Sequence, residues 1–269
     1  MNRKKRSLAI VSVFFVLLGL LFWRVYRQYE QERKDQALIT AIKAEDTPRA
    51  LELLAEGADG NSRDTGEAPS FGQVLRRFLN RLRHPGSSPV RQPDTEEHLT
   101  ALLLLYHRYE PVLAGRNERP GPELSLIRAL LEHHAQVNDR DVAGRSPLWW
   151  ACRFSGVDAV RLLLERRADT EAAGPLGQKP IIEACENPEA TRVLLEHGAR
   201  IEATDDCKRT TLMYAAMLNH TDVVQLLLQH GAKVSSGDAN GETALDHIKN
   251  RSDPESRKIA ALLRQYGAK

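Results

Sequence analysis

The sequence has few cysteines and none of the short motifs that carry enzymatic chemistry. Its 269 residues include three cysteines, and this odd number gives a long chain no disulfide framework. It has no Cys-x-x-Cys, His-Glu-x-x-His or Gly-x-Ser-x-Gly motif and no glycine-rich phosphate loop. We therefore predict no catalytic residue, no metal site and no cofactor.

An excess of charge of one sign is also missing. The formal net charge is +2, although 28% of the residues are charged. Beyond the first residues of the chain, no block of Lys and Arg with interleaved aromatics occurs, which argues against a nucleic-acid binder. A chain of this length and composition can support one elongated domain with a hydrophobic core.

Two groups of titratable residues resemble sites but have simpler explanations. Asp205 and Asp206 lie at a predicted loop tip, where Asp favours turns. His133, His197 and His230 recur at one position of a repeat, and such a column could suggest a metal. Cationic side chains at helix ends also interact favourably with the helix dipole and the last carbonyls. We interpret both groups as structural.

What the sequence does contain is a repeat with a period of about 33 residues, a length typical of stacked supersecondary units. Each copy begins like Ser/Thr-Pro-Leu, continues into a run of leucines and closes near a small residue. The closing residues Ala135, Ala168, Ala199 and Ala232 follow one another at nearly constant spacing, and Ala268 closes a less regular last copy. Units repeated in this way cannot bury their apolar faces alone.

The pattern inside one copy predicts a helix pair followed by an outward loop. Small and apolar residues recur at helical spacing in Thr210–Asn219, and the run Val223–Leu228 is apolar enough to be buried on two sides. Gly198 and Gly231 fall where the end of a helix needs a residue that tolerates positive φ. The fold class predicted from these residues is all-α.

These copies resemble the ankyrin-repeat family. Its pattern of turn, T-P-L-H-x-A-A helix, short turn, V-V-x-L-L-L helix and G-A-D hairpin is matched by Asp141–Asp169 and Asp205–Ala232, and the resemblance covers roughly residues 36–269. It implies an ankyrin-repeat solenoid without catalytic chemistry, in which hairpin tips and first helices form a concave groove that binds a protein partner.

Carried over by position, the resemblance implies a set of groove residues. Phe154 and Met217 stand out, because apolar side chains at positions expected to be exposed mark binding surfaces. Trp149 replaces the family's His and is expected in the core, whereas Trp150 is expected at the groove floor. The full predicted set is Val142, Ala143, Arg145, Trp150, Arg153, Phe154, Leu176, Gln178, Glu186, Asp206, Cys207, Arg209, Met217 and Leu218.

The three cysteines have different expected surroundings. Cys152 and Cys185 occupy the same position of successive repeats, where the family has a small residue. Stacked helices lie about 8–10 Å apart, beyond the reach of a disulfide, so both are expected to be buried thiols. Cys207 falls in a hairpin loop and is expected to be accessible.

The first half of the repeat region is less regular. Gln36–Asp59 forms one unit, but the next closing residue, Ala135, comes more than two repeat periods after Ala58. Two interpretations remain open: two units plus an insertion near 84–122, or a single repeat interrupted by a long excursion. The whole region then holds about five to six units.

The segment 71–83 has the pattern of a basic amphipathic helix and allows two interpretations. Apolar residues from Phe71 to Leu82 follow a helical stripe, and four arginines fill the other face. Because Asp64–Ser70 resembles the opening turn of a repeat, we favour a core helix of the stack. The alternative is a basic amphipathic helix on a membrane or partner surface.

A membrane anchor is predicted before the repeats. Leu8–Trp23 contains no charged residue, follows a basic tail at 1–7 and precedes aromatic residues. At about 1.5 Å per residue it spans about 24 Å, short of a hydrocarbon core of about 30 Å. No small-x-small site follows it, which favours an uncleaved anchor at 8–26 with a linker at 27–35 over a signal peptide.

The distribution of basic residues favours, by a narrow margin, an amino terminus in the cytoplasm. The repeat domain would then lie in a bacterial periplasm or an organelle lumen. We expect a single-pass protein of the bacterial inner membrane, with the opposite orientation as the alternative.

Together these patterns predict a membrane-anchored scaffold that binds a protein partner. One alternative is an immunity protein that neutralises a toxin by one-to-one binding, and another is lipid-surface binding through residues 71–83. Neither nucleic acid nor a small-molecule substrate is expected.

Overall fold

The computed structural model describes the backbone of residues 3–66, 68–83, 99–107, 123–154 and 156–269. The side chains of residues 3–18, 81–83 and 107 lie outside the described part. Within these ranges the chain forms helices and two isolated β-bridges, without an extended strand. The predicted all-α class is confirmed for the residues described.

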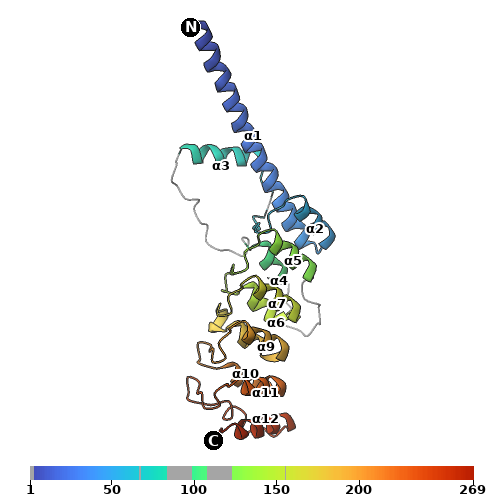
Figure 1. The fold of residues 1–269 in the computed structure, drawn as a ribbon, viewed down its shortest axis with the longest axis vertical. Coiled ribbons are helices and arrows are strands. Elements are labelled where there is room, and N and C mark those ends of the chain that lie inside the picture. Colours follow the sequence, from blue (N-terminus) through green and yellow to red (C-terminus); the bar gives the residue numbers. More distant parts are fainter. Residues whose placement is uncertain (1–2, 67, 84–98, 108–122, 155) are drawn as a thin grey trace.

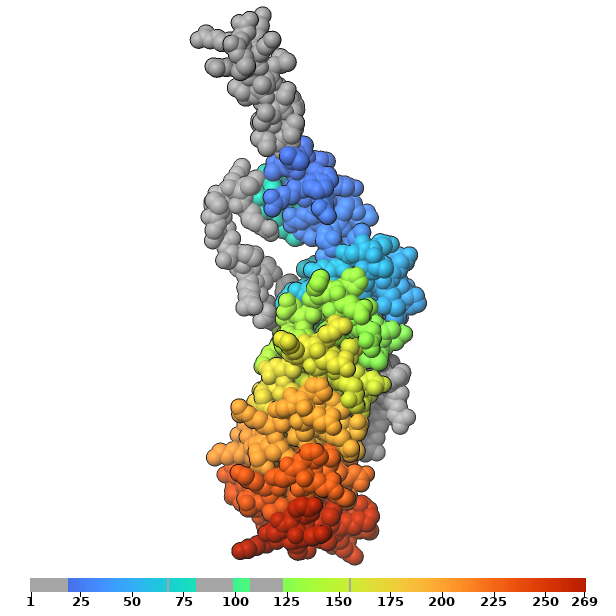
Figure 2. All heavy atoms as spheres, viewed as in Figure 1, coloured from blue at the N-terminus to red at the C-terminus, as the bar shows by residue number. Residues whose placement is uncertain are grey.

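Most helices stack in pairs along one long axis, in the order of the sequence (Figure 1; Figure 2). The pairs are the end of α1 (Arg3–Lys43) with α2 (Thr47–Ala55), α4 (Ala101–His107) with α5 (Leu124–Glu132), α6 (Pro147–Phe154) with α7 (Val157–Glu165), α8 (Pro180–Glu183) and the 3₁₀ turn η4 (Ala184–Glu186) with α9 (Pro188–Glu196), and α10 (Thr211–Met217) with α11 (Thr221–Gln229). The last helix, α12 (Pro254–Gln265), is preceded by turns at 244–250. Besides α12, the described elements outside the pairs are α3 (Phe71–Arg83) and the 3₁₀ turn η3 (Pro175–Gly177).

Local sequence explains where several helices begin and end. The side chains of Asn187 and Asp253 accept hydrogen bonds from backbone N–H groups in the first turns of α9 and α12, which have no partner inside the helix. Gly198 and Gly231 follow α9 and α11 with φ of +87° each. The predicted positive φ at these two glycines is confirmed.

The core runs along the whole stack. In α7 and α11 most residues between the first and last turns are buried, because neighbouring pairs cover these second helices from both sides. One apolar cluster extends from Leu38 in α1 to Ala203, and a second from Cys185 to Leu263 in α12. Each pair is therefore stabilised by its neighbours.

Each pair from the second onward, and likewise the last segment with α12, is preceded by a hairpin that is closed by one backbone hydrogen bond. The N–H of Asp205 donates to the carbonyl of Arg209 at 3.2 Å, next to an antiparallel bridge between Thr204 and Thr210. We name each hairpin by its first residue. The five hairpin bonds are Asp64 to Leu99, Asp141 to Arg145, Gly174 to Gln178, Asp205 to Arg209 and Asp238 to Glu242.

The Asp64 hairpin locates the irregularity of the first half. Its closing bond, from the N–H of Asp64 to the carbonyl of Leu99, measures 2.9 Å, and a bridge joins Arg63 to Thr100. The other hairpins close within a single turn, whereas this one closes only after the chain has passed through α3. Among the described residues between Ala58 and Ala135, one helix pair belongs to the stack, which fits the interpretation of a single interrupted repeat. The predicted insertion near 84–122 falls largely on 84–98 and 108–122, outside the described residues.

The prediction that residues 71–83 form a core helix of the stack is wrong. Because the Asp64 hairpin leads directly into α4, helix α3 leaves the row of pairs and packs mainly against α1 (Figure 1). Val74 is buried, whereas Leu79 is 44% exposed. The opening turn at Asp64 was recognised correctly, but its helix is α4.

Helix α1 runs without interruption from residue 3 to the first pair of the stack. The predicted linker at 27–35 is part of this helix, and its side chains bond to the loop after α2. Lys34 Nζ donates to the carbonyl of Glu56 at 2.7 Å, and Asp35 Oδ1 accepts the N–H of Asp59 at 2.9 Å. The direction of α1 is therefore tied to the direction of the stack.

Most of the predicted anchor lies outside the described side chains, which begin at residue 19 in α1. Among the residues that the structure does describe, no helix combines the length and the apolar character needed to cross a membrane.

Candidate functional site

The hairpins are held rigidly by aspartate side chains. Asp141 Oδ1 accepts the N–H groups of Ala143 at 3.0 Å and Arg145 at 2.9 Å. Asp205 Oδ1 accepts the N–H groups of Cys207 at 2.9 Å and Arg209 at 2.8 Å. The same carboxylate oxygen thus closes the turn in both hairpins, as Asp does in an Asx-turn.

The second carboxylate oxygen of Asp141 holds two side chains. It accepts Nε of Arg145 at 2.6 Å and Nε1 of Trp150 at 3.2 Å. The guanidinium carbon of Arg145 lies 4.3 Å from the centroid of the Trp150 ring, within the range of a cation–π contact. We call these three residues the Asp141 clamp. They attach the hairpin to α6.

A second set with the same spacing is the Asp205 clamp. Asp205 Oδ2 accepts Nε of Arg209 at 3.0 Å and the hydroxyl of Tyr214 at 2.7 Å. The guanidinium carbon lies 4.9 Å from the Tyr214 centroid. Burial, together with the hydrogen bond to Asp205, raises the pKa of Tyr214 to about 12. The phenol therefore stays protonated and acts as the donor.

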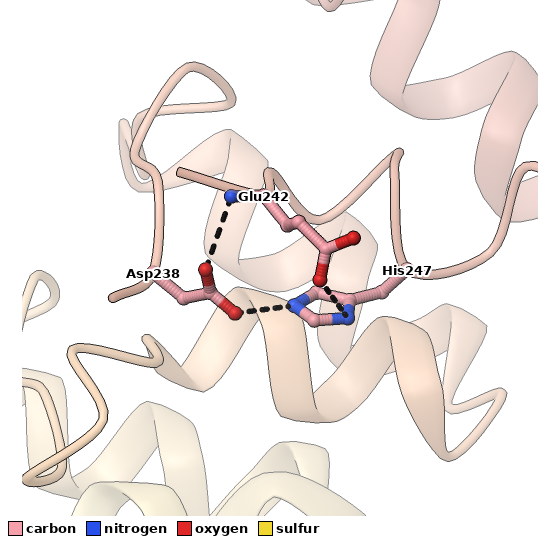
Figure 3. A group of neighbouring side chains, drawn as sticks. All are labelled: Asp238, Glu242 and His247. Carbon is pink, nitrogen blue, oxygen red and sulfur yellow. Dashed lines mark hydrogen bonds and ion pairs between the residues drawn. The ribbon is translucent and has the colours of Figure 1, made fainter. Parts of the chain in front are cut away.

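The third set consists of Asp238, Glu242 and His247 (Figure 3). His247 Nε2 lies 3.1 Å from Asp238 Oδ2, and His247 Nδ1 lies 4.0 Å from Glu242 Oε2. These groups are close enough together to hold a metal ion. However, Asp238 and His247 have the same separation in sequence as Asp141 and Trp150. Asp205 and Tyr214 have this separation too. We therefore interpret it as a third clamp, in which the imidazole replaces the indole or phenol.

The environment of Asp238 fits a fixed hairpin carboxylate. Burial by itself would raise the pKa of Asp238, but the hydrogen bonds from the backbone N–H groups of Glu242 and Asn240, and the nearby His247, lower it overall. The N–H to carboxylate distances are 3.0 Å for Glu242 and 2.8 Å for Asn240. The ionised carboxylate is thus the form that closes the turn.

The Gly174 hairpin breaks this pattern. Glycine stands where the other hairpins have aspartate, and the position of the ring is taken by Glu183, which is 6% exposed. Glu183 Oε2 accepts Nη1 of Arg153, from the preceding pair, at 2.9 Å. Burial raises the pKa of Glu183, and Arg153 opposes part of that rise. Here the first helix is tied to its neighbour instead of to its own hairpin.

Apolar side chains are exposed on the hairpin tips and at the end of α10. Val142 is 51% exposed, Leu176 67% and Leu218 47%. Leu176 also has a φ of +53°, which is a left-handed conformation that costs free energy for a side chain other than glycine. Burial does not compensate for this cost at Leu176. We call the hairpin tips and the exposed ends of the first helices the tip face.

Neighbouring tips are linked to each other. The N–H of Asp206 donates to the carbonyl of Leu176 at 3.0 Å, and the N–H of Ala239 donates to the carbonyl of Cys207 at 2.8 Å. A Cβ atom added to Gly177 would lie 2.2 Å from Asp206 Oδ1, so glycine is required there for the close approach. The tip face is a connected platform.

The structure places the predicted groove residues at three depths on this face. Seven of them are exposed: Val142, Ala143, Arg153, Leu176, Glu186, Asp206 and Leu218, and so is Cys207. Four are half-buried: Phe154, Gln178, Arg209 and Met217. The remaining two, Arg145 and Trp150, are buried at 6% and 0% exposure.

The buried pair corrects the sequence-based prediction. A partner cannot contact Arg145 or Trp150, because both lie beneath the hairpin in the Asp141 clamp. Phe154 is also less available than predicted, since its ring packs 5.5 Å from that of Trp150. Trp149, at 5% exposure, is in the core as predicted.

Two other sequence-based predictions are confirmed by contacts. His197 and His230 each place Nδ1 against a carbonyl of the last helical turn, at 2.8 Å from Val193 O and 2.9 Å from Leu226 O. All three cysteines are free, with Cys207 exposed and the other two buried. Burial raises the pKa of the Cys185 thiol to about 12 and that of Cys152 further.

Sequence reasoning missed the clamps and the buried Glu183. A signal for the clamps was present, since Asp recurs at one fixed distance before Trp, Tyr or His in three copies. Glu183 gave no such signal, because its partner Arg153 belongs to another copy.

Comparison with known proteins agrees with this architecture. A family model described as ankyrin repeats in three copies matches residues 120–205 and 181–269. Ankyrin repeat domain-containing protein 63 of Homo sapiens is 32% identical over 136 residues, which cover 48% of this chain and 33% of that protein. The Mus musculus protein of the same name is 31% identical over 136 residues, with the same shares. The chain thus matches about a third of the length of these curated relatives. Because the family model spans more than half of the chain, this protein belongs to the ankyrin-repeat family.

Proposed function

We propose that this chain is a membrane-anchored scaffold that holds a protein partner on its tip face and has no catalytic chemistry of its own. Ankyrin repeats in general form protein-interaction scaffolds and are non-catalytic. Leu176 carries the proposal. The side chain of Leu176 is 67% exposed, so its burial does not offset the cost of the left-handed conformation, and such strain is typical of functional surfaces.

The surroundings of Leu176 support a binding surface. Val142 and Leu218 add exposed apolar area, and Arg153, Glu186 and Asp206 add charges of both signs. Apolar anchors within a polar rim are the usual anatomy of a protein interface. Because hydrogen bonds link neighbouring tips, the tips lose less conformational entropy when a partner binds.

The membrane anchor is proposed from the sequence. Leu8–Trp23 carries no charge, and the basic run Arg3–Arg6 comes shortly before it. We propose that this segment is inserted in a bacterial inner membrane and that the stack lies in the periplasm. Alkaline carbonate extraction of membranes tests the anchoring, since an inserted chain stays in the pellet and a peripheral chain is released.

Partner binding is tested by photo-crosslinking in native cells. A photoreactive amino acid at Leu176 should capture one defined partner, whereas the same probe at Tyr266, which is 44% exposed at the far end of the stack, should not. Leu176→Asn removes the apolar group but keeps a residue that accepts positive φ. This variant should abolish the capture by a probe at Val142. Equal capture from Tyr266, or capture that survives Leu176→Asn, would place the binding surface elsewhere.

The immunity-protein alternative is a prediction that the same capture addresses. It requires a partner that is toxic by itself, a one-to-one complex and loss of toxicity on binding. A partner that is harmless when expressed alone argues for the scaffold.

A further inference from the structure

Helix α3 begins beside α1, close to the end of the apolar run, and extends to one side of it (Figure 1). The ring of Phe71, at the start of α3, lies 5.7 Å from that of Phe22 and 5.7 Å from that of Tyr29. Farther along α3, Arg77 Nη1 lies 3.2 Å from Glu32 Oε2. These contacts fix α3 against α1 and away from the stacked pairs.

The same contacts give the orientation of α3 about its own axis. Glu32 lies on the stack side of Tyr29 along α1, so the side of α3 that carries Arg77 faces the stack. At about 100° per residue, Leu75 and Leu79 lie on the opposite side. That side faces the amino-terminal part of α1. Leu79 is 44% exposed there.

Exposed apolar side chains gather at this end of the molecule. Of the ten large apolar residues that are exposed in the described part of the chain, six lie on α1 and α3: Leu20, Leu21, Phe22, Trp23, Tyr26 and Leu79. Their exposures range from 37% at Leu21 to 61% at Phe22. Exposed apolar side chains that gather in this way mark a surface that packs against a partner or a membrane.

The charge of α3 indicates what covers it. Its 13 residues include four arginines and no Asp or Glu. Arg76 is exposed, and Arg77 contacts α1. Basic amphipathic helices of this composition bind at the boundary of anionic lipid bilayers, and Trp and Tyr are enriched at that same depth.

We propose that α3 lies flat on an anionic lipid bilayer, with Leu75 and Leu79 in the headgroup boundary and the exposed Arg76 at lipid phosphates. This inference rests on the proposed anchoring by Leu8–Trp23. Because α1 continues into the first pair of the stack and α3 packs against it, the two helices hold the solenoid upright above the bilayer. The tip face is thereby presented at a fixed height and direction.

The experiment uses the full chain reconstituted into phosphatidylcholine vesicles, with or without phosphatidylglycerol. Cys207→Ser removes the exposed thiol, and a polarity-sensitive fluorophore is attached at Leu79→Cys. The matched control carries it at Asn80→Cys, which is exposed on the side of Arg77. We expect a lipid-borne quencher to act about three-fold or more strongly at position 79, as expected for neighbouring positions on different sides of an interfacial helix.

Charge is tested separately on the chain labelled at position 79. Arg76→Glu should weaken the quenching in phosphatidylglycerol vesicles towards the level in pure phosphatidylcholine. Arg264→Glu, an equal change of an exposed arginine at the far end of the stack, should have no effect.

The outcomes separate the two proposals. A chain that carbonate releases from the vesicles overturns the anchoring and this placement of α3 with it. A chain that is retained, but is quenched equally at positions 79 and 80, leaves the anchoring standing and overturns the placement of α3. Quenching that is independent of phosphatidylglycerol and of Arg76 overturns the recognition of anionic lipid.

Discussion

The Asp141 and Asp205 clamps share one hydrogen-bond pattern, but their aromatic rings are buried to different depths. In both, one carboxylate oxygen closes the hairpin and the other holds an arginine and an aromatic ring of the first helix. Trp150 is fully buried, whereas Tyr214 is half-buried. The same sequence spacing therefore places an aromatic ring in the core of one repeat and near the surface of another.

The repeat between them shows what happens when the carboxylate is lost. Gly174 replaces the aspartate, and a Cβ atom there would lie 2.5 Å from Nε1 of Trp149. The indole of Trp149 thus occupies the space that a side chain would need. Glu183 supplies the missing negative charge from the helix, and it pairs with Arg153 instead of with its own hairpin.

The largest expected difference between the two clamps comes from removing the ring. Trp150→Ala should destabilise the fold by about 3–5 kcal/mol, because it leaves a large cavity and an unpaired indole partner. Tyr214→Ala should cost about 1–3 kcal/mol, since water can enter the half-buried site. Urea unfolding of the full chain in detergent, followed by circular dichroism, measures both. Equal costs would show that depth does not distinguish the clamps.

Gly174→Ala tests the repeat that lacks a clamp. The added methyl group meets the Trp149 ring, and overpacking of this kind costs about 1–3 kcal/mol. Trp149→His introduces the smaller residue that is usual in the family, and it should remove most of the penalty in the double variant. Additive effects in this double-mutant cycle would show that the two residues do not compete for one space.

Tyr214→Phe isolates the hydroxyl of the shallow clamp. Loss of its hydrogen bond to Asp205 should cost about 1 kcal/mol at neutral pH. Since the folded pKa is raised to about 12 from an ordinary value near 10, the contribution is present below pH 10 and is lost as pH rises towards 12. Stability curves of wild type and variant should therefore converge at alkaline pH. A constant gap would mean that the hydroxyl does not titrate as the clamp requires.

Acid should affect the end of the stack before its middle. The pKa of Asp253 is lowered by the N–H of Ser256, and that of Glu255 is lowered by Lys258. Their contributions are present above the ordinary value near pH 4 and are lost as pH falls below it. The pKa of Glu183 is raised by burial, so its contribution has the opposite sign and is lost as pH rises. Hydrogen exchange at pH 3 should therefore show earlier loss of protection in α12 than in α8.

The smallest effect is expected at the cysteines. A thiol reagent should modify Cys207 in the folded chain and leave Cys152 and Cys185 untouched until unfolding, because burial excludes the reagent and raises the pKa of both buried thiols. Mass spectrometry of the labelled chain gives the number of modified cysteines. Modification of the buried pair under native conditions would show that the repeats open locally.

Much of the fold could be predicted from the sequence, because the repeat period is a local property. The leucine runs, the glycines after α9 and α11 and the depth of all three cysteines follow from residues within one copy. The irregular half could not be assigned in this way. The pairing of Asp64 with Leu99 joins residues that are far apart in sequence, and the residues between them gave two competing patterns.

By itself, the sequence determined the class of fold, the repeat and the family pattern, since stacked units need only a fixed periodicity of apolar and small residues. Only the tertiary structure decided three other features: that α3 leaves the stack for α1, that Trp150 is fully buried in its clamp, and that Glu183 pairs across repeats. Each of these depends on contacts between chain segments that pack together, and a linear pattern does not encode which segment comes to cover which.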